Sequence, residues 1–212
     1  MNKRRLYKAL NHKDVRSLNE AEYFAEKRGK KLNTMITVHP KLLELYPNDV
    51  GHWVWWLLNK LRIWCERDRG FGYFAIWVRE NYEGDRREHL HMLLCVPERE
   101  RTKLEDTLRS WLPGDEKAVH VGRPEYKRDS YGQRVNKALT YLLKQMTPQA
   151  CFALDRRVRR EKHCRDTGAP VAAVLGKRCG VSRSLDARAR KSFWLMRTPH
   201  TADAAERRAR SA

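Results

Sequence analysis

The sequence predicts an α+β domain: an antiparallel sheet of about five strands with helices mainly on one face. Two observations carry this prediction. Segments in which apolar or β-branched residues alternate with polar ones are typical of strands, and segments with apolar residues at helical spacing are typical of amphipathic helices. Along the 212-residue chain they follow one another as strand, helix, strand, strand, helix, strand, helix. A length of 212 residues suits one such domain with an appendage.

The first predicted strand covers residues 32–39, where polar residues alternate with apolar or β-branched ones until Pro40 ends the segment. A helix over residues 50–67 follows, and Gly70 lies just beyond its end. Its apolar residues recur at helical spacing, which predicts that they face the core: Trp53, Leu57, Leu61 and Trp64.

The next two strands form a predicted hairpin. Residues 71–80 are rich in aromatic and β-branched residues, residues 81–88 are a polar turn region, and residues 89–96 form the returning strand. Pro97 ends the hairpin, and a helix is expected over residues 98–112. A short strand at residues 118–121 and a helix over residues 130–146 complete the predicted domain.

Two histidines, His89 and His91, flank Leu90 at the start of the returning strand. Side chains alternate between the faces of a strand, so the two imidazoles share one face and Leu90 packs behind them. Glu80 joins that face if it lies across from His89 or His91, whereas a register shifted by one residue places it on the other side. The rival carboxylate, Glu88, is expected on the opposite face.

A carboxylate beside two neutral imidazoles can bind a divalent metal ion and leave open positions for substrate oxygens. The alternative is a half-buried strand that carries two histidines without a ligand, with Glu80 as a solvated charge at a strand end.

Tyr141 and Lys144 lie three residues apart on the last predicted helix, so they share a face. Next to a metal ion, a tyrosine hydroxyl can attack a phosphodiester and form a covalent bond to DNA. The lysine supplies the positive charge that favours the phenolate or stabilises the transition state. The alternative is a tyrosine packed at a helix edge with its hydroxyl in water.

These motifs together resemble the HUH endonucleases, and their order resembles the rolling-circle replication initiator (Rep) branch with a single tyrosine. The resemblance covers roughly residues 32–145 and implies a ferredoxin-like or RRM-like sheet. It implies a Mg²⁺ or Mn²⁺ ion held by His89, His91 and Glu80, with Tyr141 as the nucleophile and Lys144 as the helix lysine.

The same resemblance implies an enzyme that nicks single-stranded DNA or an extruded origin hairpin, stays linked to the 5′ phosphate and later rejoins strands. Relaxases place their tyrosine near the N-terminus, which would nominate Tyr7 or Tyr23 instead. Tyr131 is a candidate for a second tyrosine or a helix-start residue. Two rival functions remain: a single-tyrosine transposase or relaxase, and a non-catalytic RRM-like module that uses Tyr73 and Trp77 to bind single strands.

The charge of the chain supports a nucleic-acid partner. Lys and Arg number 45 against 26 Asp and Glu, a formal net charge of +19. Beyond residue 148 the composition becomes arginine-rich, and we expect phosphate contacts that do not read sequence. The predicted contacts are Arg156, Arg157, Arg159, Arg160, Lys177, Arg178 and Arg183.

The expected organisation is a basic N-terminal segment (1–30), an endonuclease domain (31–148), a basic helical extension (149–197) and a disordered tail (198–212). The chain has no P-loop, so a replication initiator of this kind would need a host helicase. Five cysteines without regular spacing, no signal peptide and no apolar run of membrane-spanning length predict a cytoplasmic protein, encoded by a bacterium, phage or plasmid, without a membrane partner.

Overall fold

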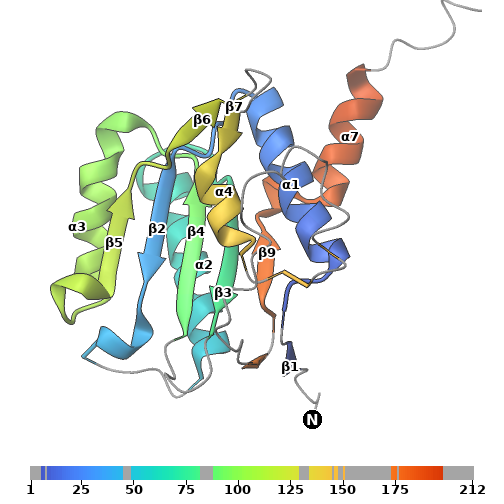
Figure 1. Cartoon of the computed structure of the whole chain (residues 1–212). Coiled ribbons are helices and arrows are strands. Elements are labelled where there is room, and N and C mark those ends of the chain that lie inside the picture. The colour runs from blue at the N-terminus through green and yellow to red at the C-terminus, as the bar shows by residue number, and fades with distance from the viewer. Residues whose placement is uncertain are drawn as a thin grey trace, which may run out of the picture.

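The computed structural model describes residues 6–7, 9–44, 49–81, 88–128, 134–144, 146–147, 150, 173–175 and 177–197. Its centre is a five-stranded antiparallel sheet with the strand order β5-β2-β4-β3-β9 (Figure 1). The strands are β2 (Thr34–Val38), β3 (Ala75–Glu80), β4 (His89–Leu94), β5 (Val119–Gly122) and β9 (Cys179–Val181). This confirms the predicted α+β class with an antiparallel sheet.

The first four of these strands follow a β-α-β-β-α-β order, which is the ferredoxin-like arrangement. The connecting helices are α2 (Val50–Ile63), which continues into a π-helical turn at Trp64–Asp68, and α3 (Arg101–Trp111). Both pack on the same face of the sheet, against a core cluster that includes Ile36 and Met92. The connecting helices therefore lie on one face, as the sequence predicts.

The other face of the sheet is also covered by helices, which corrects the expectation that helices lie mainly on one face. These helices are α1 (His12–Lys27), α4 (Lys137–Leu142) and α7 (Ala187–Arg197). They enclose a second core cluster with Ile76, Val78 and Leu93 of the sheet. The physical reason is that β3 and β4 carry large apolar side chains on both faces and all six residues of β3 are buried, so water must be excluded from both sides.

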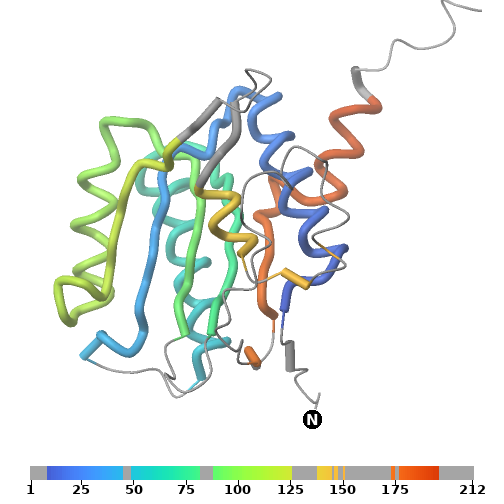
Figure 2. Tube along the Cα trace, in the orientation of Figure 1, coloured from blue at the N-terminus to red at the C-terminus, as the bar shows by residue number. Residues whose placement is uncertain are grey.

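Helix α1 begins at a capping box, in which the Asn11 side chain accepts from the Asp14 amide and Asp14 accepts from the Asn11 amide. It packs beside α7 (Figure 2), where the rings of Phe24 and Phe193 lie 5.1 Å apart and Arg190 pairs with Glu20 at 3.1 Å. Elements from both ends of the chain therefore share one core with the sheet.

The remaining strands are short: β1 (Leu6–Tyr7) pairs with β8 (Val174–Leu175), and β6 (Tyr126–Arg128) pairs with β7 (Arg134–Asn136). The helix predicted over residues 130–146 is wrong at its start, because residues 134–136 pair as a strand and the helix covers only Lys137–Leu142. The predicted disordered tail, residues 198–212, lies outside the described residues, and the predicted domain boundaries stay a prediction. In the described part of the chain, no helix has the length and apolar character needed to cross a bilayer.

Candidate metal centre

The hairpin of β3 and β4 brings a carboxylate and two imidazoles to one face of the sheet. Glu80 lies directly across from His89, and Val78 lies across from His91. The predicted register is therefore present. One ligand atom from each of Glu80, His89 and His91 can be chosen so that all lie within 4.8 Å of one another. The spacing is small enough for one ion to contact all three groups.

Glu80 and His91 are buried, with 0% and 1% of their surface exposed. The Oε2 atom of Glu80 accepts hydrogen bonds from Lys144 Nζ at 2.7 Å and His91 Nε2 at 3.1 Å. The Oε1 atom is buried and has no hydrogen-bond partner among the described residues. A buried carboxylate oxygen without a donor is costly unless a cation or water satisfies it, so the donor set fits a metal ion.

The protonation states also suit metal binding. Burial acts to raise the pKa of Glu80, but the hydrogen bond and charge of His91 and the charge of Lys144 outweigh it, and the pKa falls below its ordinary value. Burial, followed by the neighbouring His39 and His91, lowers the pKa of His89 to about 4. At neutral pH the site therefore holds an ionised carboxylate and a neutral His89 imidazole, both able to bind a cation.

Two further residues of the site are Thr37, on β2, and His39, directly after the end of β2, and the sequence reasoning missed both. Thr37 lies across from His91, and its Oγ1 is 3.0 Å from His91 Nδ1. A hydroxyl can donate or accept, so it can hold the ring whichever nitrogen carries the proton. The ring of His39 packs edge-on against His89, with 4.2 Å between centroids. The alternation of polar and apolar residues over the segment 32–39 could have indicated both, because it places Thr37 and His39 on one face.

Tyr141, on α4, and Lys144, in the turn that follows the helix, both lie at this cluster. The prediction that one helix carries both residues is wrong for Lys144, because α4 ends at Leu142. The rings of Tyr141 and His91 lie 5.1 Å apart in an edge-to-face arrangement, and Tyr141 is 41% exposed. The Lys144 ammonium lies 3.6 Å from the centroid of the Tyr141 ring and bonds to Glu80. Burial acts to lower the pKa of Lys144, but Glu80 and Tyr141 raise it above its ordinary value, so the side chain is a cation at neutral pH.

The remaining predicted residues fall in several places. Glu88 forms an ion pair with Arg79. Arg79 precedes Glu80 in β3, so its side chain lies on the face opposite the metal centre, and Glu88 lies there too, as the sequence predicts for the rival carboxylate. Tyr73 and Trp77 are each 8% exposed and belong to the core beneath α2 and α3, so they do not form an open aromatic sheet face.

Among the predicted phosphate contacts, Lys177 and Arg183 are exposed beside β9. Arg178 is 2% exposed, which corrects its assignment, because a buried guanidinium has no surface to offer a phosphate. Tyr131 lies outside the described residues, and so do the four arginines of the first basic cluster: Arg156, Arg157, Arg159 and Arg160.

Comparisons with protein-family models, with curated proteins and with solved structures find no match. The geometry itself gives the conclusion. The described residues contain one group that could hold a metal ion, formed by the buried Glu80 and His91 and the half-buried His89. Tyr141 of α4 and Lys144 in the turn after α4 lie against it.

Proposed function

We propose that the protein is a metal-dependent endonuclease of the HUH type that nicks and rejoins single-stranded DNA through a phosphotyrosine intermediate. One observation carries the proposal: Tyr141 on α4 and Lys144 in the turn after it lie against the face that holds Glu80 and the two histidines. A tyrosine and a lysine with only a structural role do not need to lie beside a group of metal-binding side chains. A transesterification site needs the nucleophile, the cation and the metal ligands together.

The proposed cofactor is one Mg²⁺ or Mn²⁺ ion held by His89, His91 and Glu80. Oε1 of Glu80, which has no hydrogen-bond partner in the described part of the chain, and the neutral His89 supply the oxygen and nitrogen ligands that such an ion needs. When bound, the ion would polarise a non-bridging oxygen of the scissile phosphate. Imidazole and carboxylate also bind Zn²⁺ and Fe²⁺, so the experiments below compare several divalent ions.

In the proposed reaction, the phenolic oxygen of Tyr141 attacks phosphorus and gives its proton to solvent, which its 41% exposure allows. An O–P bond to the tyrosine forms while the bond from phosphorus to the 3′ oxygen breaks, and the released 3′ oxygen takes a proton from water. The Lys144 ammonium, beside the ring of Tyr141, stabilises the negative charge on the phenolate and the phosphate. The phosphotyrosine keeps the bond energy, so a 3′ hydroxyl can reverse the step without ATP.

The substrate proposed is single-stranded DNA or an extruded hairpin, because in-line attack needs a phosphate that a duplex does not constrain. The formal net charge of +19 suits such a polyanion. Initiation of rolling-circle replication of a plasmid or phage, with a host helicase, is the role that the motif order favours. A single-tyrosine transposase or relaxase would use the same chemistry, and the target sequence would separate these roles.

The test is a covalent-adduct assay. The protein is incubated with a random-sequence library of single-stranded oligonucleotides and Mg²⁺, Mn²⁺, Zn²⁺ or no metal, and the products are run on a denaturing gel. We expect a shifted protein–DNA band with Mg²⁺ or Mn²⁺ that disappears in Tyr141→Phe. Tyr23→Phe is the matched control, because Tyr23 is also exposed, at 52%, but lies on α1. An adduct that survives Tyr141→Phe, or no adduct with any library and metal, would contradict the proposal.

A further inference from the structure

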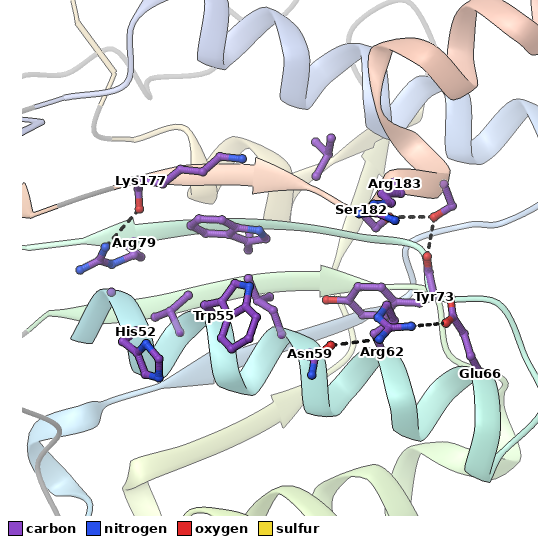
Figure 3. A pocket seen from close by; sticks show the side chains of 16 residues that line it. His52, Trp55, Asn59, Arg62, Glu66, Tyr73, Arg79, Lys177, Ser182 and Arg183 are labelled. Carbon is purple, nitrogen blue, oxygen red and sulfur yellow. Dashed lines mark hydrogen bonds and ion pairs between the residues drawn. The ribbon is translucent and has the colours of Figure 1, made fainter. Parts of the chain in front are cut away.

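A groove lies on the face of the sheet opposite the metal centre, between α2 and the β3–β9 edge (Figure 3). It has a volume of about 1120 Å³. Enclosed sites for one small ligand are typically about 300–1,000 Å³, so this open groove is larger than such a site requires. Its side chains take no part in the chemistry proposed above.

The groove is lined by aromatic side chains at two depths. Trp77, from β3, and Tyr73 lie in its wall and are almost completely buried, whereas Trp55, from α2, is 63% exposed at its mouth. Gly180 permits this arrangement, because a Cβ atom there would lie 2.9 Å from the Trp77 indole. The Trp55 indole therefore presents a large apolar surface to water, and a ligand in the groove could cover it.

The charge of the lining is strongly positive: four basic side chains and one carboxylate. Two of the basic groups are occupied within the protein, since Arg62 pairs with Glu66 at 3.0 Å and Arg79 pairs with Glu88. Lys177 and Arg183 are exposed.

These two exposed cations flank β9, at either end of the groove's upper wall in Figure 3. They are six positions apart in the chain, a span of at most about 20 Å. Two cations at that separation, with the exposed indole of Trp55 on α2 across the groove, match an extended polyanion whose bases can stack. A single phosphate would need fewer contacts.

We infer that this groove binds a segment of single-stranded DNA, with a base stacked on Trp55 and backbone phosphates on Lys177 and Arg183. Single strands suit it better than duplex, because the indole can stack only on a base that is free of its partner. The groove would hold DNA on the far side of β3 from Tyr141, as an anchor for the strand outside the reaction site. The choice of single-stranded DNA rests on the proposed function, but the groove uses none of the residues proposed for catalysis.

The test measures affinity without chemistry. A fluorescein-labelled oligo(dT) of about 12 nucleotides, within the usual site size of single-strand binders, is titrated in EDTA and followed by anisotropy. Trp55→Ala is expected to weaken binding by roughly 5- to 150-fold, the usual effect of losing one base–aromatic stack, whereas Trp55→Phe keeps most of it. Lys177→Ala should reduce the slope of log K against log[salt] by about 0.7, the value for one phosphate contact on a single strand.

The matched controls are Tyr23→Ala and Lys27→Ala. These two residues form an exposed aromatic–cation pair on α1, with Lys27 Nζ 5.2 Å from the centre of the Tyr23 ring, and should leave the affinity unchanged. Trp55 is exposed enough that its loss should not unfold the protein, which circular dichroism checks. The inference would be overturned if Trp55→Ala bound the oligonucleotide as tightly as the wild-type protein. It would also be overturned if Tyr23→Ala lost as much affinity as Trp55→Ala. Because no metal is present, neither result depends on whether Tyr141 forms an adduct.

Discussion

Replacement of Glu80 by Gln should both destabilise the metal-free protein and abolish its response to metal. The substitution keeps the shape of a fully buried side chain and removes its charge. In the native site that charge is shared by Lys144 Nζ at 2.7 Å and His91 Nε2 at 3.1 Å. The variant therefore leaves the Lys144 ammonium without its anion in a largely buried position.

The size of the loss follows from the burial of the two partners. Removing one partner of a buried ion pair typically costs about 3–5 kcal/mol. The Lys144 side chain is 18% exposed, so water partly compensates it, and we expect the lower end, about 3 kcal/mol. For a protein of this size, each kcal/mol lowers the Tm by about 2–4 °C, which gives a decrease of roughly 6–12 °C.

The assay is thermal unfolding followed by circular dichroism, with and without MnCl₂. At a metal concentration 100 times the Kd, the wild-type protein should gain about 2.7 kcal/mol, or roughly 5–11 °C in Tm. Glu80→Gln should gain almost nothing, because the charged ligand is missing. Glu100→Gln is the matched control: Glu100 is also a buried carboxylate, with Arg69 at 3.6 Å and Lys103 at 3.8 Å. Among the described residues, no histidine joins Glu100 in a group that could hold a metal ion.

The control should lose stability and keep the full increase in Tm with metal. An unchanged Tm of metal-free Glu80→Gln would refute the argument from the buried ion pair. A full response to Mn²⁺ in that variant would refute the assignment of Glu80 as a ligand.

Three further outcomes are expected. Thr37→Val, which removes the hydroxyl bonded to His91, should weaken metal binding by about 10- to 100-fold in titration calorimetry without unfolding the protein; unchanged affinity would contradict the orienting role. Burial lowers the pKa of His89 from its ordinary value of 6.5 to about 4 in the folded protein. Between these two pH values the unfolded chain binds the proton and the folded protein does not, so the free energy of unfolding should fall as the pH decreases from 6.5 to 4. In urea titrations, His89→Gln should lack that part of the decrease. Burial raises the pKa of Cys65 and Cys179 to about 12, so iodoacetamide at pH 8 should label neither in the native protein, as peptide mapping can verify.

The local pattern of the sequence predicts the hairpin and the way it brings the three candidate metal ligands together. Alternation and Pro97 define the strand that begins at His89, and the short turn region sets the register that places Glu80 across from it. Helical spacing likewise separates the core face of α2, with Leu57 and Leu61, from the exposed Trp55.

The rest depends on contacts between segments far apart in the chain. Thr37 and His91 are 54 residues apart, and no local pattern indicates that β2 pairs with β4. The addition of β9 to the sheet edge, which buries Arg178, depends equally on distant pairing. Helix α4 is also shorter than its apolar periodicity suggests, because the residues before it pair with β6.

The central claim is that Tyr141 is the residue that attacks DNA, and mapping the adduct tests it most directly. Protein–DNA adduct formed with Mn²⁺ would be digested with nuclease and trypsin, and the nucleotide-bearing peptide identified by mass spectrometry. The account predicts the modification on the peptide of residues 138–144, which contains Tyr141. Modification of the peptide of residues 6–8, 17–27 or 129–134 would assign the reaction to Tyr7, Tyr23 or Tyr131 and contradict the account.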